Sequence, residues 1–176
     1  FVHGASGSVG TAAIQLAKRA GITAIGSAGT DRGRQLVRDQ GATHVVDHTK
    51  AGYLDEVREA TGGEGPSLIL EMLADVNLAA DLDLVAKYGR IIVIGNRGEI
   101  TINPRMTMMK ELDVRGIALF NGAAAEMAAI MGDLVAGLDD GSLNPVVGRE
   151  MPLAEAAAGH VAVLEPGAFG KIVLVP

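Results

Sequence analysis

The chain alternates between short apolar runs and longer stretches in which apolar residues recur every three or four positions. Short apolar runs are typical of buried strands, and a spacing of three to four residues is typical of one face of a helix. We interpret the stretch that contains Pro145 and Pro152 as a loop. The pattern predicts strands at 22–28, 43–47, 67–73, 90–94, 112–119 and 171–175, and helices at 9–20, 31–40, 53–61, 78–87, 123–138 and 154–164.

Strands and helices follow one another along most of the chain, and this order predicts the fold class. The apolar runs at 67–73 and 90–94 are nearly continuous, as in parallel strands that helices cover on both faces. We therefore expect an α/β fold, a doubly wound parallel sheet of the Rossmann type with three αβα layers. The 176 residues suffice for one such domain. Because only Phe1–His3 precede the first turn, we expect the chain to be part of a longer protein.

The segment His3–Gly10 is a glycine-rich turn that leads into the first predicted helix. It follows the dinucleotide fingerprint G-x-G-x-x-G, with Ala5 at the first glycine and Gly7 and Gly10 at the other two. In that motif the second glycine admits a pyrophosphate, the third lets helix and strand pack closely, and the amides that open the helix bind the anion. The alternative is a turn that serves packing alone. The setting in a β-α-β unit favours a dinucleotide site formed by Ser6, Gly7, Ser8, Val9 and Gly10.

The end of the second strand decides between NAD and NADP. A carboxylate there binds the ribose hydroxyls of NAD, and it repels the additional phosphate of NADP. The segment Ser27–Thr30 has no carboxylate, and we place Asp31 beyond the strand, as the N-cap of the next helix. Arg32 and Arg34 follow and could bind a 2′-phosphate, although arginines that open a helix also occur on solvated faces. The sequence favours NADPH, with Asp31 as the counter-evidence and Arg34 as a candidate contact.

Composition excludes several other kinds of site. The chain has no cysteine, so it holds no disulfide, thiolate zinc site or cysteine nucleophile. Its net charge is −6 and its basic residues form no cluster, which argues against a nucleic-acid surface. Neither H-E-x-x-H nor G-x-S-x-G occurs. No apolar run is long enough for a membrane span, and we expect a soluble, cytoplasmic protein with no membrane partner.

Several segments, in order, resemble the cofactor domain of the medium-chain dehydrogenase/reductase superfamily, of the zeta-crystallin type of NADPH:quinone oxidoreductase. The resemblance implies hydride transfer from NADPH to a quinone or another electron-poor small molecule. It also implies that a GroES-like catalytic domain precedes the cofactor domain and is absent from this chain. The likeness covers nearly the whole chain and is most specific at 3–7, 28–30, 71–74, 76–78, 89–93 and 102–105.

The resemblance assigns cofactor contacts near the ends of successive strands. Ser6–Val9 would hold the pyrophosphate, Gly29 would meet the adenosine ribose phosphate, and His48 would lie near the adenine ribose end. Asn77 would border the cofactor beyond the predicted strand at 67–73. The nicotinamide side and the stretch before the next helix would be formed by Ile94, Gly95, Asn96, Arg97, Ile117, Ala118 and Leu119.

Some of these positions have plainer interpretations. Ser8 replaces a glycine that is common in the family, and Asn96 replaces a common serine. His48 is equally well explained as a surface histidine, and Arg97 as a residue that caps a loop. Glu71, at the end of an apolar strand, is more simply a buried carboxylate bonded to neighbouring amides.

Three functional hypotheses remain open. The first is a quinone reductase, the second a zinc alcohol dehydrogenase or enoyl reductase of the same superfamily, and the third a nucleotide-binding module without turnover. Cysteine, histidine and glutamate ligands upstream would indicate zinc, whereas we name no catalytic residue and no metal ligand in this chain. We expect this domain to be inactive alone.

By resemblance the strand at 112–119 lies at the sheet edge and pairs across a dimer axis, so we expect a homodimer.

Overall fold

The computed structural model describes residues 1–176, which divide into two compact units. The first unit comprises Phe1–His3 and Lys50–Asp133, and the second comprises Gly4–Thr49 and Leu134–Pro176. Every pair of neighbouring strands within these units is parallel. This is the α/β class that the alternation of strands and helices predicts.

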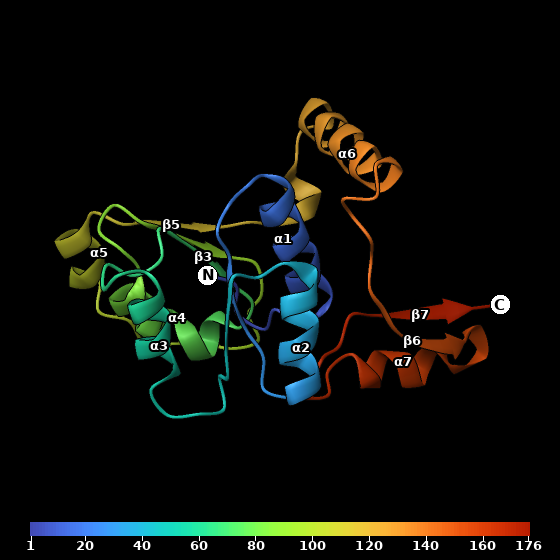
Figure 1. Ribbon diagram of the computed structural model, residues 1–176, viewed down its shortest axis with the longest axis horizontal. Coiled ribbons are helices and arrows are strands. Elements are labelled where there is room, and N and C mark those ends of the chain that lie inside the picture. Colours follow the sequence, from blue (N-terminus) through green and yellow to red (C-terminus); the bar gives the residue numbers. More distant parts are fainter. The chain divides into compact units, whose positions relative to one another are not determined.

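The second unit begins with a helix, a strand, a helix and a strand in succession. These elements are α1 (Ser8–Arg19), β1 (Ile25–Ser27), α2 (Asp31–Gln40) and β2 (His44–Val46). β1 and β2 pair with Ile25 opposite His44, and α1 packs beside α2 (Figure 1). A glycine with positive φ follows each helix, Gly21 after α1 and Gly41 after α2, a conformation in which helices commonly end.

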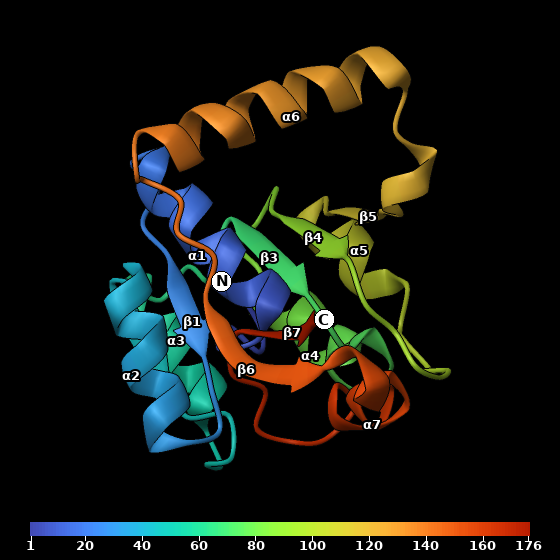
Figure 2. The ribbon, with the colours of Figure 1, turned by 90° about the vertical axis from the view of Figure 1, so that its right-hand side faces the viewer.

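A second parallel pair of strands completes this unit. β6 and β7 are connected by a short 3₁₀-helix, η2, and by α7 (Figure 2). Their bounds are β6 Val147–Pro152, η2 Leu153–Glu155, α7 Ala156–Ala162 and β7 Lys171–Val175. The strand β6 corrects the prediction of a loop through Pro145 and Pro152. Gly148 and the charged pair after it hide the apolar pattern, and Pro152 is tolerated because β6 is paired on one side only.

The first unit holds a three-stranded parallel sheet in the order β3-β4-β5. Val2 makes an isolated parallel bridge to Leu70 of β3, so Phe1–His3 lie beside that strand. The strands are β3 (Leu68–Glu71), β4 (Arg90–Val93) and β5 (Asp113–Gly116), with β5 at one edge (Figure 2). The helices are α3 (Tyr53–Ala60), α4 (Ala74–Leu84) and α5 (Arg105–Lys110).

Three elements of this unit differ from the prediction. α4 begins at Ala74 and ends at Leu84, where the sequence predicts 78–87, because the extended Val85 closes the helix early. α5 has no predicted counterpart, since six residues are too few to show a helical period. The strand predicted at 112–119 is confined to Asp113–Gly116, and Leu119–Asn121 form a 3₁₀-helix, η1.

α6 (Ala124–Asp139) begins in the first unit and ends in the second. Most of its apolar side chains are exposed, and Gly137 is its one buried residue. None of the helices is both long and apolar enough to cross a membrane. Apolar side chains from strands and adjacent helices are buried in each unit, among them Val2, Val57, Ile69, Leu82 and Ile91 in the first and Ile14, Ile25, Val37, Val46 and Met151 in the second.

Candidate functional site

The glycine turn of the second unit is held against β1 by backbone contacts. The amide of Ala5 donates to the Ser27 carbonyl over 2.8 Å, and the amide of Gly4 donates to the Ser27 hydroxyl over 3.1 Å. Gly10 of α1 packs directly on this segment. A β-carbon at Gly10 would lie 2.5 Å from the Cα of Ala5 and 2.7 Å from the Gly4 carbonyl oxygen. Gly10 therefore has the packing role that the fingerprint gives its third glycine.

The amino end of α1 leaves its first backbone amides without a cap. The N-cap residue is Gly7, which has no side chain to accept from them, and the first turn contains no acidic residue. The first amides of a helix have no partner within it, and the helix dipole adds partial positive charge at that end. The segment Gly7–Gly10 therefore fits an anion such as a pyrophosphate.

The hydroxyls of Ser6 and Ser8 bind the C-terminal segment instead of capping α1. Ser6 donates to the carbonyl of Ala168 over 2.7 Å, and Ser8 donates to the carbonyl of Gly170 over 2.9 Å. The amide of Gly170 in turn donates to the Ser6 carbonyl over 2.7 Å. A ligand at this turn would therefore be bound by backbone amides and not by these two hydroxyls.

Gly29 and His48 are neighbours beyond the ends of β1 and β2. A β-carbon at Gly29 would lie 2.7 Å from Nε2 of His48 and 3.0 Å from Cγ2 of Thr49, so glycine is needed for the present position of the imidazole. Nδ1 of His48 lies 3.4 Å from the hydroxyl of Ser27. Open α/β sheets bind ligands at the carboxyl ends of their strands, where these residues lie.

Arg34 of α2 is held between two carboxylates. Its Nη1 lies 2.8 Å from Oδ2 of Asp47, and its Nη2 also pairs with Asp31. The Arg34 side chain is 16% exposed, whereas that of Asp31 is 98% exposed. Arg32 contacts neither of these carboxylates and lies over the ring of Phe169, 3.8 Å from its centre. Arg34 thus contacts Asp47, the residue that directly follows β2.

Thr30, and not Asp31, is the N-cap of α2. Thr30 has an extended backbone, and its hydroxyl oxygen accepts from the amide of Gly33 over 3.0 Å. Asp31 is the first helical residue, and its carboxylate binds Arg34. The prediction of Asp31 as N-cap was wrong by one residue, because a threonine hydroxyl fills that position equally well.

In the first unit, the buried carboxylate of Glu71 links the end of β3 to the start of α4. Its Oε1 accepts from the backbone amide of Leu73 and, over 3.2 Å, from Nδ2 of Asn77. Glu71 is fully buried and Asn77 is half-buried. The interpretation of Glu71 as a carboxylate bonded by nearby amides is confirmed.

His3, Glu71 and Asp81 form a buried polar cluster. Nε2 of His3 lies 2.8 Å from Oδ1 of Asp81 and 3.3 Å from Oε2 of Glu71. Burial disfavours the charged form of each group. It raises the pKa of Glu71 to about 7 and that of Asp81 to about 6, and it lowers the pKa of His3 to about 4. The two carboxyl groups therefore keep protons at pH values where surface carboxyl groups have lost them.

The cluster is spaced for hydrogen bonds and not for zinc ligation. Tetrahedral ligand atoms about 2.1 Å from zinc stand about 3.4 Å apart, whereas the His3 nitrogen and the Asp81 oxygen are 2.8 Å apart. That distance is typical of a hydrogen bond. We therefore assign the cluster to hydrogen bonding, and we derive no chemistry from a metal ion in this chain.

The segment after β4 lies against the start of α4. A β-carbon at Gly95 would stand 2.3 Å from the carbonyl oxygen of Met72, so the two backbones touch. The amide of Arg97 donates to the carboxylate of Asp75 over 2.9 Å, and the side-chain amide of Asn96 donates to a carbonyl two residues on over 2.7 Å. The side chains of Asn96 and Arg97 are exposed. The backbone of Arg97 thus closes a loop.

The predicted cofactor contacts fall into groups at strand ends. The second unit gathers Gly7–Gly10 at the start of α1 and Gly29 with His48 beyond β1 and β2. The first unit places Asn77 and the segment 94–97 beyond β3 and β4. The residues 117–119 follow β5, where Ile117 and Leu119 are exposed.

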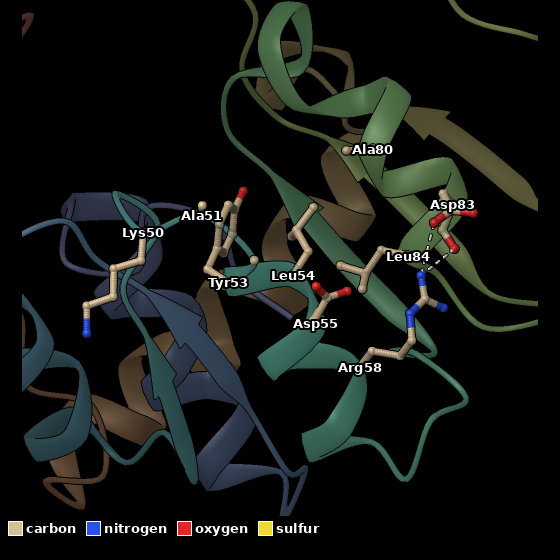
Figure 3. Close-up of a pocket in the computed structure, with 10 residues that line it drawn as sticks. Lys50, Ala51, Tyr53, Leu54, Asp55, Arg58, Ala80, Asp83 and Leu84 are labelled. Carbon is tan, nitrogen blue, oxygen red and sulfur yellow. Dashed lines mark hydrogen bonds and ion pairs between the residues drawn. The ribbon is translucent and has the colours of Figure 1, made fainter.

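A hollow of about 370 Å³ opens elsewhere in the first unit, between α3 and α4 (Figure 3). Its lining includes Tyr53 and Leu84, together with Arg58, which donates to the carboxylate of Asp83 over 3.0 Å (Figure 3). It contains none of the predicted cofactor contacts. The hollow is therefore separate from the candidate site.

Sequence reasoning missed two groups of contacts near the candidate site. His3 and Asp81 form a contact although 78 residues separate them. The only local signal is that Asp81 interrupts an apolar stretch. The contact between Ser6 and Ala168 spans 162 residues and has no local signal.

Comparison with known proteins places these features in a family. Residues 8–136 match the family described as zinc-binding dehydrogenase. The quinone oxidoreductase of Homo sapiens is 43% identical over 176 residues, which cover 99% of this chain and 54% of that protein. The chain thus spans about half the length of the curated relatives that it matches.

Two solved structures share the fold over 99% of the chain. An NAD-dependent alcohol dehydrogenase has a TM-score of 0.88 and 29% identity, and 50% of its chain is covered. The quinone oxidoreductase of Escherichia coli, complexed with NADPH, has a TM-score of 0.86 and 24% identity, and 56% of its chain is covered. These likenesses confirm the doubly wound, Rossmann-type class. The chain belongs to the zinc-binding dehydrogenase family, within the medium-chain dehydrogenase/reductase superfamily that its sequence resembles.

Proposed function

We propose that this chain is the cofactor domain of an NADPH-dependent oxidoreductase that reduces a quinone or another electron-poor small molecule. The observation that carries the proposal is the uncapped amino end of α1, which follows a glycine turn packed tightly on Gly10. Quinone oxidoreductases that are 42–43% identical over nearly the whole chain support the reaction class. Two solved proteins with this fold were determined with NADPH.

Each part of the candidate site has a role in this proposal. The amides of Ser8–Gly10 bind the pyrophosphate, and Gly29 with His48 borders the adenosine ribose. Asn77 and the segment 94–97 bound the nicotinamide portion, with 117–119 beyond them. The nicotinamide supplies the hydride, and the residues of this chain bind and orient it.

The preference for NADPH rests on the end of β1 and on Arg34. Ser27 and Ala28 are buried and carry no carboxylate that could bind the ribose hydroxyls of NADH. Arg34 already binds Asp47 on its buried side and the exposed Asp31 on the other. A 2′-phosphate would replace Asp31 as the partner of Arg34, because an exposed ion pair contributes little to stability.

The alternative is a zinc alcohol dehydrogenase or enoyl reductase of the same superfamily, and an NAD-dependent alcohol dehydrogenase shares the fold at 29% identity. Metal content and alcohol oxidation by the longer protein separate the two. A GroES-like domain beside this one, the quinone acceptor and a cytoplasmic location stay predictions from the sequence. Cofactor binding without reduction of any acceptor would instead support a binding module.

Side-by-side titration of the chain with NADPH and NADH tests the proposal. We expect NADPH to bind at least tenfold more tightly, and Arg34→Gln to remove most of that preference. Arg38→Gln is the matched control, because Arg38 lies one turn further along α2 and contacts Gln35. Equal affinity for the two cofactors would overturn the preference for NADPH, and no binding of either would overturn the proposed function.

We also propose a homodimer that forms through β5. All residues of β5 are exposed at the edge of its sheet, and Phe120 shortly after it is 90% exposed. Unpaired strand edges readily pair with another strand. We expect sedimentation to show a dimer that Val114→Lys converts to a monomer, and a monomeric parent chain at micromolar concentration would contradict the proposal.

A further inference from the structure

The structure distinguishes the two ends of the Asn77 side-chain amide. Its Nδ2 lies 3.2 Å from Oε1 of Glu71, whereas its Oδ1 contacts no donor of the protein. A carboxylate oxygen accepts hydrogen bonds, so the end of the amide that faces Glu71 has to be the N–H donor. The carbonyl oxygen of Asn77 consequently points away from Glu71 and is available as an acceptor.

Glu71 is itself held rigidly. Its Oε1 accepts from the backbone amide of Leu73 as well as from Asn77. Its own carbonyl accepts from the amides of Ile94 and Gly95 over 2.8 and 3.2 Å, which connects it to the segment after β4. The side chain is fully buried. These contacts fix the acceptor that orients Asn77.

The second carboxylate oxygen faces the buried cluster. Oε2 of Glu71 lies 3.3 Å from His3, and His3 lies 2.8 Å from Asp81. A proton taken up by Glu71 therefore resides on the Oε2 side, next to these groups. Oε1 stays an acceptor whether Glu71 is ionised or protonated, so the orientation of Asn77 is the same in both states.

We propose that Glu71 is a positioning residue of the dinucleotide site, which holds Asn77 so that its carbonyl oxygen accepts a hydrogen bond from the bound cofactor. The inference rests on the proposed function. Asn77 lies in the first turn of α4, beyond the end of β3, where open α/β sheets bind ligands. The ligand group it requires is a hydrogen-bond donor, either a ribose hydroxyl or the N–H of the nicotinamide carboxamide.

A double-mutant cycle on NADPH affinity tests this assignment. We expect Asn77→Ala and Glu71→Leu each to weaken binding roughly 5- to 10-fold, the effect of one hydrogen bond. The double variant should bind no more weakly than Asn77→Ala, because Glu71 acts through Asn77. Glu71→Gln keeps an oxygen acceptor toward Leu73 and should recover most of the affinity lost in Glu71→Leu. Additive losses in the double variant would show that Glu71 supports the fold only, and would overturn the proposal.

An NADPH analogue in which a carboxylate replaces the nicotinamide carboxamide shows which cofactor group is the donor to Asn77. If the carboxamide is the partner, Asn77→Ala should weaken NADPH but leave the analogue's affinity unchanged. If a ribose hydroxyl is the partner, both ligands should weaken equally. An Asn77→Ala variant that binds NADPH as tightly as the parent chain would contradict either assignment.

The side-chain amide signals of Asn77 in a nitrogen-15 spectrum give a test that does not depend on the folding of Glu71→Leu. We expect them to be shifted by the bond to Glu71 in the free chain, and to change again when NADPH binds. Signals at the positions of solvent-exposed asparagines would overturn the proposal. Failure of the parent chain to bind NADPH or NADH would count against the proposed function, while the spectrum of the free chain would still report on the link between Glu71 and Asn77.

Discussion

At the scale of single residues, Glu71 makes the free energy of unfolding depend on pH. Its pKa of about 7 lies above the ordinary value of 4.5, so between these pH values the folded chain binds a proton more tightly than the unfolded chain. The free energy of unfolding therefore falls as pH rises through this window. Asp81 acts in the same direction up to about pH 6, whereas His3, with a lowered pKa of about 4, acts in the opposite direction between pH 4 and 6.5.

Glu71→Gln isolates this contribution. The variant keeps the size of the side chain but cannot ionise, and His3, Asp81, Tyr53 and the Phe1 amine remain in both proteins. We expect the free energy of unfolding of the parent chain to fall by roughly 2 kcal/mol more than that of the variant between pH 5 and 8. Urea unfolding at a series of pH values measures the difference. Parallel pH profiles would show that Glu71 titrates normally.

Gly10 and Gly132 give a matched pair of glycine substitutions. Gly10→Ala would place a β-carbon 2.5 Å from the Cα of Ala5, and backbone atoms cannot yield as a flexible side chain does. We expect a loss of at least about 3 kcal/mol, since helix and turn have to separate. Gly132, within α6, has no atom within 4 Å of a β-carbon, so Gly132→Ala should stabilise the chain by up to about 1 kcal/mol. Thermal unfolding of both variants checks the opposite signs.

At the scale of elements, the sequence predicts α1 and α2 well because each has one apolar face and ends at a glycine. It predicts α4 poorly, because the apolar residues of Ala74–Leu84 surround the helix and the buried Asp81 interrupts them. It misses β6 because Gly148 and the charged residues after it break the period of two. Local patterns identify an element when one face is apolar and the other polar, and fail when burial follows tertiary contacts.

The cap of α2 allows a test at this scale. The Thr30 hydroxyl accepts from the amide of Gly33, and its loss would leave that amide without a partner. We expect Thr30→Ala to lower the free energy of unfolding by about 1 kcal/mol and Thr30→Ser to lower it by much less. Equal losses in the two variants, measured by urea unfolding, would assign the effect to the methyl group of Thr30.

At the scale of the whole molecule, the sequence predicts where the candidate site lies better than it predicts the long-range contacts around that site. Gly10 and the start of α1 follow a local motif, and Gly29 and His48 follow strand ends, so pattern and resemblance reach them. The link of Glu71 to His3 and Asp81 depends on which strand and helix become neighbours, which no local pattern specifies. The same holds for Ser6 and the C-terminal segment.

The bonds of Ser6 and Ser8 to residues 168–170 also bear on how the chain is made. A ribosome adds the two serines 162 residues before the carbonyls that accept from them. During synthesis, the hydroxyls of Ser6 and Ser8 therefore lack these partners until residues 168–170 have left the exit tunnel. The two serine contacts therefore form later than the packing of Gly10 on Gly4 and Ala5, which needs only neighbouring residues of the turn.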